Sequence, residues 1–317
     1  MDTFADLASV VRDDAVVPDH NDVQSYDPAP ANQSPSASVA AAPPYTVIEP
    51  IQGQAPLVFA SPHSGRIYPA HFLSLARAGL ASLRRSEDAY VDQLFARAVH
   101  SGGALISATI ARAYIDLNRD PAELDPGMYR DAIQAPAASA RVQAGLGAIP
   151  RIAGDGAPIY RGKLSATVAQ ERIDAVHKPY HARLRSLLER KKQEFGCAVL
   201  IDCHSMPSAA RGPHAPDIVL GDRYGAACHA SVTALAEAML RRRGYRVARN
   251  APFAGGHTTQ MYGRPRERTH ALQIEINRAL YLEEATLAPH TGFARVAADM
   301  TCLAEALAAA EFHKSLA

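Results

Sequence analysis

Cysteine is scarce in this sequence and shows no pairing pattern. Only four occur among 317 residues, and none of them belongs to a CxxC pair. In a chain of this length, that usage argues against a disulfide framework or a structural zinc knot and favours buried, reduced thiols. We therefore expect Cys197, Cys203, Cys228 and Cys302 to be free and the protein to be cytoplasmic.

The sequence also lacks segments suited to a membrane or to export. No run approaches the roughly 18 uninterrupted apolar residues of a membrane-spanning helix, and MDTFADLASVVRDD at the N-terminus has acids where a signal peptide needs basic residues. The 33 basic and 32 acidic residues give a net charge of +1, which favours neither nucleic acid nor an anionic membrane. We expect a small-molecule partner, and homo-oligomerisation stays open.

Several catalytic motifs are missing as well. Neither a GxSxG nucleophile elbow nor a GxxxxGK[ST] phosphate loop occurs. Cys203 stands beside His204 in VLIDCHSM (199–206), but neighbouring residues of a strand point to opposite faces, so Cys203 is predicted to face the core. Asp202 shares the face of His204 and either supports the imidazole or caps a helix.

What the sequence does contain is an α/β pattern behind a low-complexity tail. Residues 1–44 are predicted to be a disordered tail, because 26–44 consist almost entirely of proline, alanine, serine and small polar residues. Residues 45–317 are predicted to form a single domain whose sheet is covered on both faces, since short apolar runs alternate with stretches of helical period. Strands are predicted at 55–61, 103–110, 198–204, 217–222, 245–250 and 270–277, and helices near 87–100, 165–195, 225–243 and 290–313.

Polar residues gather where these predicted strands end. In open α/β sheets, ligands bind beyond the carboxyl ends of the strands. We therefore expect one polar rim at that edge of the sheet. Its expected members are residues 61–65, residues 116–120, Asp202, His204, Asp222, Glu275 and Asn277.

A metal site is the first candidate on this rim. His63 and His204 each follow an apolar run, and a catalytic zinc ion takes three nitrogen or oxygen ligands and keeps a fourth position for water. The segment SEDAYVDQLF (86–95) offers Glu87, Asp88 or Asp92 as the third ligand. The alternative is that each histidine bonds a backbone carbonyl.

Three further histidines receive a different interpretation. His177 and His181 have the i, i+4 spacing of a helical zinc pair, but Lys178 replaces the glutamate of HExxH and Pro179 disturbs the helix. A helix face packed on the sheet is the favoured interpretation for this pair. His257, behind two glycines, is placed to contact a substrate from a loop.

Glu275 is a carboxylate within the apolar strand HALQIEIN. Burial raises the pKa of a carboxyl group, and a general base needs a pKa nearer neutrality than a free glutamate has. A buried ion pair with Arg278 or Arg119 is an equally good interpretation of this residue.

An acidic substrate is indicated by Asn118 and Arg119 in YIDLNRD. A guanidinium group can hold a carboxylate through two parallel hydrogen bonds. Arg264, in MYGRP, offers a second group of this kind. The alternative for Arg119 is ion pairing with Asp116 or Asp120.

Taken together, these segments resemble the N-formylglutamate amidohydrolases, also called N-formylglutamate deformylases. The similarity covers most of 56–283 in a consistent order. The family is similar in fold to zinc carboxypeptidases and aspartoacylases, so the resemblance implies a three-layer α/β/α sandwich on a mixed, mostly parallel sheet of the phosphorylase/hydrolase-like type. The matching segments are SPHSGRIYP (61–69), SEDAYVDQLF (86–95), ARAYIDLNRDPAELDP (111–126), PIYRGKLS (158–165), IDCHS (201–205), DIVLGDRYG (217–225), NAPFAGGHTTQMYGRP (250–265) and HALQIEINRALY (270–281).

The resemblance also implies a ligand set for one divalent metal ion, with zinc as the first choice and cobalt or another divalent ion as alternatives. His63 and His204 would be ligands, and Asp88 matches the family's acid better than Glu87 does. The short HxxE motif of carboxypeptidases is absent, because Arg66 follows His63 at that spacing. The third ligand is therefore the open point.

The implied reaction is hydrolysis of the formamide bond of N-formyl-L-glutamate to formate and L-glutamate, as at the end of one route of histidine degradation. Glu275 matches the glutamate that acts as general base on metal-activated water, and Asn118 and Arg119 match the pair that binds the α-carboxylate. His257 and Arg264 are further candidates for contact with this small acidic N-acyl amino acid. Two alternatives stay open: an amidohydrolase for other N-acyl amino acids, and a non-catalytic binding protein that retains the fold.

Overall fold

The computed structural model describes residues 43–50, 54–208, 215–309, 313 and 316. Of the tail predicted at 1–44, residues 1–42 lie outside the described residues. The last two, Pro43 and Pro44, provide carbonyl groups that accept hydrogen bonds from the Thr109 hydroxyl and amide. The tail and the single domain over 45–317 therefore stay predictions.

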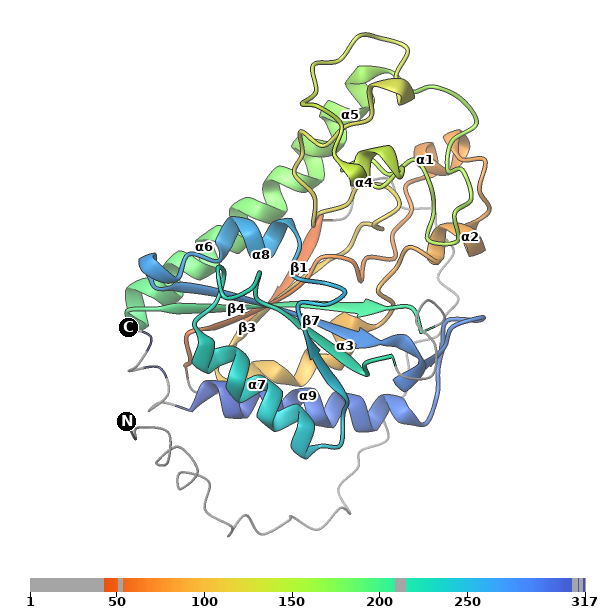
Figure 1. Ribbon diagram of the computed structural model, residues 1–317. Helices are drawn as coiled ribbons and strands as arrows, with labels where there is room; N and C mark the ends of the chain where they lie inside the picture. Colours follow the sequence, from red (N-terminus) through yellow and green to blue (C-terminus); the bar gives the residue numbers. More distant parts are fainter. Residues whose placement is uncertain (1–42, 51–53, 209–214, 310–312, 314–315, 317) are drawn as a thin grey trace. The chain divides into compact units, whose positions relative to one another are not determined.

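A seven-stranded mixed sheet forms the centre of the described chain, in the order β1-β3-β2-β4-β7-β5-β6 (Figure 1). The strands are β1 (Tyr45–Ile48), β2 (Leu57–Ser61), β3 (Ala104–Ala108), β4 (Ala198–Met206), β5 (Ile218–Gly221), β6 (Val247–Arg249) and β7 (Thr269–Asn277). Neighbouring strands are parallel except β1–β3 and β5–β7, which are antiparallel. All six predicted strands are present, and the mixed, mostly parallel sheet is confirmed.

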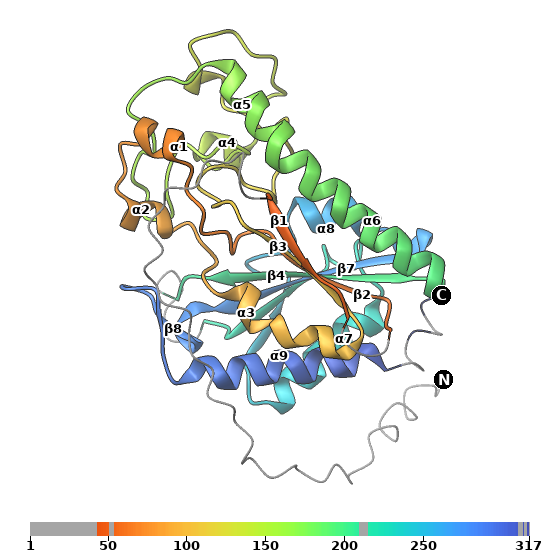
Figure 2. The ribbon, with the colours of Figure 1, turned by 180° about the vertical axis from the view of Figure 1, so that it is seen from behind.

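Helices cover both faces of this sheet (Figures 1 and 2). Along β2, Leu57 and Phe59 enter one apolar layer while Val58 and Ala60 enter the other, because successive side chains of a strand point to opposite faces. One layer is closed by α6 (Lys178–Phe195) and α8 (His257–Tyr262), and the other by α3 (Val91–Leu94), η3 (Ala96–Ser101), α7 (Ala230–Arg242) and α9 (Gly292–Ala308). The three-layer α/β/α sandwich is therefore confirmed.

The predicted helix over 165–195 is present, with one irregular turn. It comprises α5 (Ala166–Arg172), the π-helical turn η5 (Ile173–His177) and α6. Ser165 caps its start by accepting a hydrogen bond from the Thr167 amide. Pro179 lies in the first turn of α6, directly after η5. Since proline lacks an N–H and its ring clashes with the preceding turn of a regular helix, the wider π turn lets the helix continue through it.

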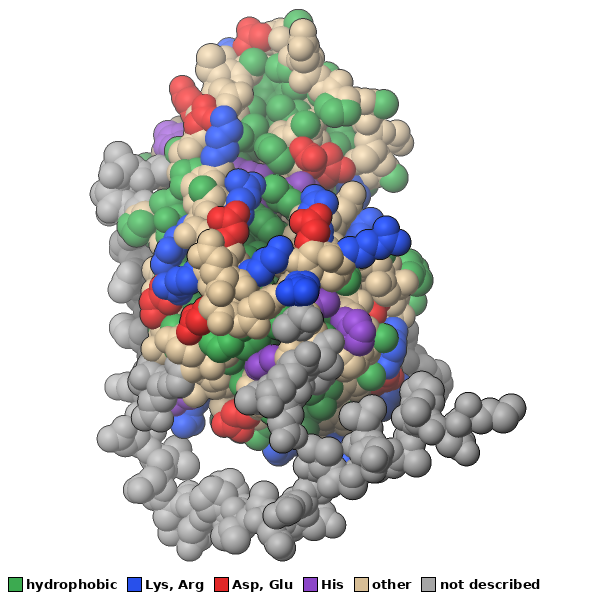
Figure 3. Space-filling model, turned by 90° about the vertical axis from the view of Figure 1, so that its left-hand side faces the viewer, with side chains coloured by type: hydrophobic (Ala, Val, Ile, Leu, Met, Phe, Trp, Pro, Cys, Tyr) green, Lys and Arg blue, Asp and Glu red, His purple; other side chains and the backbone are tan. Residues whose placement is uncertain are grey.

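Short elements complete the described chain. The helices α1, α2 and α4 lie close together, near one end of α5 (Figures 1 and 2). Their bounds are α1 (Ala70–Leu75), α2 (Leu80–Arg84), η4 (Pro126–Met128), α4 (Ala140–Gln143), η6 (Pro265–Glu267), η7 (Arg278–Leu280), β8 (Leu282–Glu283) and β9 (Ala288–Pro289). None of the helices in the described ranges is long and apolar enough to cross a membrane. Acidic and basic side chains are interspersed on the face shown in Figure 3.

The direction of β5 corrects one expectation. Because β5 is antiparallel to β7, its last residue, Gly221, pairs with Gln273 in the middle of β7. The carboxyl end of β5 therefore points away from the edge where β7 ends. Asp222 accepts hydrogen bonds there from Asn250 Nδ2 at 2.8 Å and Thr233 Oγ1 at 2.9 Å. The expectation that Asp222 joins the polar rim is wrong.

The cysteines are free, as the sequence predicts, but only three of them are buried, since Cys302 is partly exposed. Cys203 is buried in the apolar layer that α3, α7 and α9 close. Burial raises the pKa of the Cys203 thiol well above its ordinary value. Cys203 is therefore a core residue and not a nucleophile.

Candidate metal centre

The register between β4 and β7 brings two polar pairs together on one face of the sheet. His204 pairs with Glu275, and Asp202 pairs with Gln273. All four are buried on the face that α6 and α8 cover, where the earlier residues of β4 are apolar. This face therefore changes from a packed core to a polar site toward the carboxyl ends of the strands.

The second part of the site comes from the segments that follow β2. His63 lies two residues beyond the end of that strand, and its carbonyl accepts the backbone N–H of Asp88 at 3.0 Å. This hydrogen bond fixes the turn before α3 against the end of β2. It delivers the Asp88 carboxylate to the two histidines.

Three ligand atoms converge at this point. His63 Nδ1 and His204 Nδ1 lie 3.2 and 3.0 Å from Asp88 Oδ2, and 3.1 Å from each other. In a tetrahedral zinc site with bonds of about 2.0–2.1 Å, neighbouring ligand atoms are roughly 3.3 Å apart. His63, Asp88 and His204, called the triad below, therefore fit one metal ion with little movement.

Carboxylates lie on the opposite side of both imidazoles. His63 Nε2 lies 2.7 Å from Asp116 Oδ1, and His204 Nε2 lies 3.0 Å from Asp202 Oδ1. A carboxylate so close favours a proton on Nε2, which leaves the Nδ1 lone pair directed at the triad. Both rings are thus held in the tautomer that a metal ligand requires.

The electrostatics of the triad favour positive charge. Burial alone would raise the pKa of Asp88, but the imidazoles of His204 and His63 hold it well below its usual range. Burial alone would lower the pKa of His204, but Asp202 and Asp88 raise it well above the ordinary value. A buried site that stabilises its anions and attracts protons in this way suits a cation.

The other two acids of SEDAYVDQLF have different partners. Glu87 accepts hydrogen bonds from Tyr68 Oη at 2.7 Å and from Arg84 Nε at 3.2 Å. Asp92 accepts one from Arg66 Nη2 at 2.7 Å. Of the three candidate carboxylates, the structure thus brings only Asp88 to the histidines. Arg66 forms an ion pair with Asp92 instead.

Glu275 lies beside His204 and has no ion pair among the described residues. Gln273 Nε2 donates a hydrogen bond to Glu275 Oε1 at 2.9 Å. Burial raises the pKa of Glu275 to about 7. The proposed alternative of an ion pair with Arg278 or Arg119 is not found, since Arg278 instead contacts Asp88.

The family model of the N-formylglutamate amidohydrolases matches residues 55–282 of the chain. The chain belongs to this family. The N-formylglutamate deformylases of Pseudomonas aeruginosa and Pseudomonas putida are 33% and 30% identical to it, each over 74% of this chain and 84% of the relative. The crystal structure of N-formylglutamate amidohydrolase from Ralstonia eutropha JMP134 is 38% identical, with a TM-score of 0.80 over 86% of this chain and 99% of that one.

Of the residues that the resemblance to N-formylglutamate amidohydrolases assigns to the substrate, some lie at the metal centre and others do not. Asn118 lies at the site, where Nδ2 is 3.1 Å from His204 Nε2 and Oδ1 accepts the Thr258 amide at 2.8 Å. Because an amide Nδ2 can only donate and His204 Nε2 carries the proton in the assigned tautomer, Oδ1 has a protein partner while Nδ2 keeps its donor capacity for a ligand. Gly256 permits Asn118 to lie here, because a Cβ at Gly256 would lie 2.4 Å from Asn118 Nδ2.

Arg119 is buried next to the site. Its Nε donates to the Leu146 carbonyl at 3.0 Å, and Nη1 donates to the Asn118 carbonyl at 2.8 Å. Asp116 Oδ2 lies 4.0 Å from Nε, so the expected ion pair with Asp116 exists but is long. Nη2 has no hydrogen bond within the described ranges and stays available.

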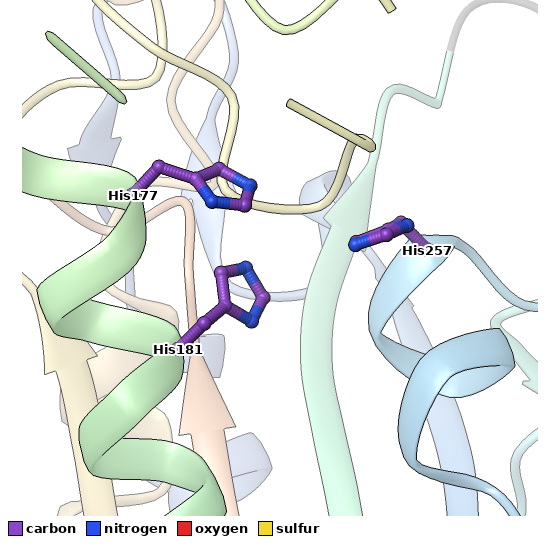
Figure 4. Close-up of side chains that lie close together, drawn as sticks. All are labelled: His177, His181 and His257. Carbon is purple, nitrogen blue, oxygen red and sulfur yellow. The ribbon is translucent and has the colours of Figure 1, made fainter. Parts of the chain in front are cut away.

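Arg264 does not reach the site in this member of the family. It forms a bridge with Thr269 at the amino end of β7, six residues before Glu275. At about 3.3 Å per residue, this is roughly 20 Å from Glu275. Its expected role in substrate binding is therefore corrected. His257 starts α8 beside Asn118 but lies with His177 and His181 (Figure 4).

Two arginines at the centre have roles that the sequence did not predict, since Arg112 was not a candidate and Arg278 was expected only as a partner of Glu275. Arg278 donates through Nη2 to Asp88 Oδ1 at 2.9 Å and through Nε to Ser205 Oγ at 3.0 Å. Arg112 donates through Nε to Asp116 Oδ2 at 2.9 Å, and its Nη1 lies 3.9 Å from Asp88 Oδ1. A sequence signal for them existed, because carboxylates that are expected to be buried need cationic side chains as partners.

Replacement of either supporting carboxylate is expected to weaken metal binding without removing a ligand. In Asp116→Asn and Asp202→Asn, the partner of one imidazole Nε2 loses its charge, and we expect metal affinity to fall by about 10- to 100-fold in each. Titration of the chelator-treated protein with Zn²⁺ measures this. The exposed Asp155→Asn is the matched control, and unchanged affinity in both buried variants would contradict the assigned tautomers.

Proposed function

We propose that this protein hydrolyses the formamide bond of N-formyl-L-glutamate to give formate and L-glutamate. The observation that carries the proposal is the convergence of His63 Nδ1, His204 Nδ1 and Asp88 Oδ2 next to the buried carboxylate of Glu275. Membership of the N-formylglutamate amidohydrolase family supports the choice of substrate. Free cysteines support a cytoplasmic location.

The triad supplies the donor set for one divalent ion, with zinc as the first choice. When bound, such an ion supplies a Lewis acid that lowers the pKa of water to about 7 and offsets negative charge on a carbonyl oxygen. Asp116 and Asp202 hold the histidine rings in the required tautomer. Arg278 fixes Asp88, so its Oδ2 stays directed at the histidines.

Glu275 is the proposed general base and acid. It takes a proton from water while the water oxygen forms a bond to the formyl carbon. It then returns a proton to the amide nitrogen as the C–N bond breaks, so formate and the amine of glutamate leave. A pKa raised toward neutrality suits both transfers, because the group must accept and release a proton at similar pH.

Two arginines are available for the negative charges of the substrate and the reaction. Arg112 is a quarter exposed and lies between Asp88 and Asp116, so we propose that it stabilises the developing oxyanion. Nη2 of Arg119 is the proposed donor to a substrate carboxylate. Asn118 is held through Oδ1 by the Thr258 amide, so its Nδ2 is the proposed second donor to that carboxylate.

The test is formate release by the full-length protein loaded with Zn²⁺ or Co²⁺. We expect kcat/KM for N-formyl-L-glutamate to exceed that for N-acetyl-L-glutamate by about 10- to 200-fold, the discrimination that one extra carbon in a fitted pocket provides. Faster cleavage of the acetyl compound would instead identify an amidohydrolase for larger N-acyl amino acids. Absence of hydrolysis with both substrates would point to a non-catalytic protein.

A further inference from the structure

A second group of histidines lies outside the triad and has no part in the proposed reaction. His177 ends the π turn η5, His181 lies one turn later in α6, and His257 begins α8. Their rings face a common space between the two helices (Figure 4). One ring nitrogen of each lies within 4.8 Å of the others. We refer to these residues as the three-histidine cluster.

We propose that the three-histidine cluster binds a second divalent transition-metal ion of the class that prefers imidazole ligands. Three neutral imidazoles are a donor set for Zn²⁺, Co²⁺, Ni²⁺ or Cu²⁺. The i, i+4 spacing of the pair was visible in the sequence, but the third nitrogen comes from a distant segment that only the fold brings into place.

The hydrogen bonds of the two buried histidines are those of metal ligands. His177 Nε2 lies 3.0 Å from the Arg119 carbonyl, and His181 Nε2 lies 2.8 Å from the Leu117 carbonyl. A carbonyl can only accept, so each Nε2 carries the proton and each Nδ1 carries the lone pair. Histidine ligands of metals usually donate their other N–H to a carbonyl or carboxylate in this way.

The third ligand is the most adaptable of the set. The imidazole of His257 is partly buried and has no hydrogen-bond partner among the described residues. The ring nitrogens lie within 4.8 Å of one another, whereas neighbouring ligand atoms of a tetrahedral site are roughly 3.3 Å apart, so rotation of the His257 side chain would close any remaining gap. Its partial exposure gives it freedom to do so.

The protonation state of the cluster agrees with this geometry. Burial lowers the pKa of His181 to about 3 and also lowers the pKa of His177 and His257. All three rings are therefore neutral at pH 7. The carboxylates of Asp116 and Asp120 act on His177 and His257 in the direction that favours a cation, whereas Arg119 and Arg185 oppose it.

The His181 ring has one competing partner. The Tyr262 hydroxyl lies 3.0 Å from His181 Nδ1 and 3.1 Å from the His181 carbonyl oxygen. The hydroxyl has one proton, which it can donate either to Nδ1 or to the carbonyl oxygen of His181. Its hydrogen bond to the carbonyl can therefore persist when Nδ1 turns to a metal ion.

A metal ion in the cluster would join segments that also support the triad. Leu117 and Arg119 contact the cluster through their carbonyls, while Asn118 between them contacts His204. The ion would fix α6, α8 and this segment relative to one another. We therefore assign the site a bracing role and not a catalytic one.

The test is metal stoichiometry, measured without reference to activity. The full-length protein is stripped with a chelator, titrated with Co²⁺ and followed by visible absorption and by metal analysis. We expect wild type and the exposed control His100→Ala to bind two equivalents. We expect His257→Ala and His204→Ala to bind one each, and the double variant none.

The variants separate this proposal from that for the triad. His257 is chosen because its imidazole is partly exposed and has no hydrogen-bond partner in the described part of the chain, so its loss should not affect folding. Loss of one equivalent in His257→Ala supports the cluster even if His204→Ala changes nothing. Unchanged stoichiometry in His257→Ala, or a complete loss of Co²⁺ in His204→Ala alone, would overturn the second site.

Discussion

Replacement of Glu275 by glutamine is expected to lower kcat for formate release by about 100- to 10,000-fold, which is the contribution of a well-placed proton-transfer group. Glutamine has nearly the same shape as glutamate and can still accept the hydrogen bond from Gln273. It cannot take a proton from water. Metal content should stay at the wild-type value, because Glu275 is not in the triad.

The control for this experiment is Glu267→Gln. Glu267 is an exposed glutamate just before the amino end of β7, so the same chemical change is made near the opposite end of the same strand. It should leave kcat unchanged. A near-normal kcat in Glu275→Gln would remove this residue from the mechanism, whereas a loss of metal would show that its role is structural.

The pH profile provides an independent readout of Glu275. Burial raises its pKa to about 7, and the base must be ionised to act. kcat/KM should therefore fall as the pH decreases through the pKa of this group. A divalent ion at the triad stabilises the carboxylate and moves that limb to pH 7 or below. The limb should be absent from the residual activity of Glu275→Gln.

Removal of the His204 imidazole is expected to have the second large effect. In His204→Ala the triad loses one of three ligand atoms, and we expect its affinity for Zn²⁺ to fall by more than about 100-fold, because loss of a ligand's hydrogen-bond partner alone costs 10- to 100-fold. Formate release should fall with it. Metal analysis of the purified protein, together with the formate assay, measures both.

His204 is a better choice for this test than Asp88. Asp88 pairs with the buried Arg278, and removing one partner of a buried ion pair destabilises a protein by about 3–5 kcal/mol. An unfolded Asp88 variant would lose metal for that reason alone. His100→Ala, at an exposed position, is the control for histidine content. Retention of the full metal content in His204→Ala would contradict the assigned centre.

Much of the sheet could be predicted because most of its strands are buried apolar runs. All of β4, and all of β7 except Thr269, is buried, which gives a clear signal. β1 was missed since it has only four residues of alternating partial exposure at the sheet edge. The direction of β5 could not be predicted, because strand composition does not encode whether a neighbour runs parallel or antiparallel. That ambiguity misplaced Asp222.

The site was predictable to the extent that strand ends fix it. His204 and Glu275 lie on paired strands, so their proximity follows from alternation and register. The residues that support the metal ligands were harder to predict from the sequence. Arg112 and Arg278 occupy irregular segments, where side-chain direction depends on the folded backbone. His257 was read as a substrate contact, since its approach to α6 depends on how α8 packs.

The contacts of the triad span long stretches of chain. His204 meets His63 across 141 residues and Asp88 across 116, and Arg278 meets Asp88 across 190. Contacts of this kind raise the contact order and form late, after the loop-closure entropy has been overcome. A nascent chain therefore has no complete centre until β7 has left the ribosome and paired with β4. The three ligands precede β7 in the chain, so it is the support of Asp88 by Arg278 and the proposed general base Glu275 that join the centre last.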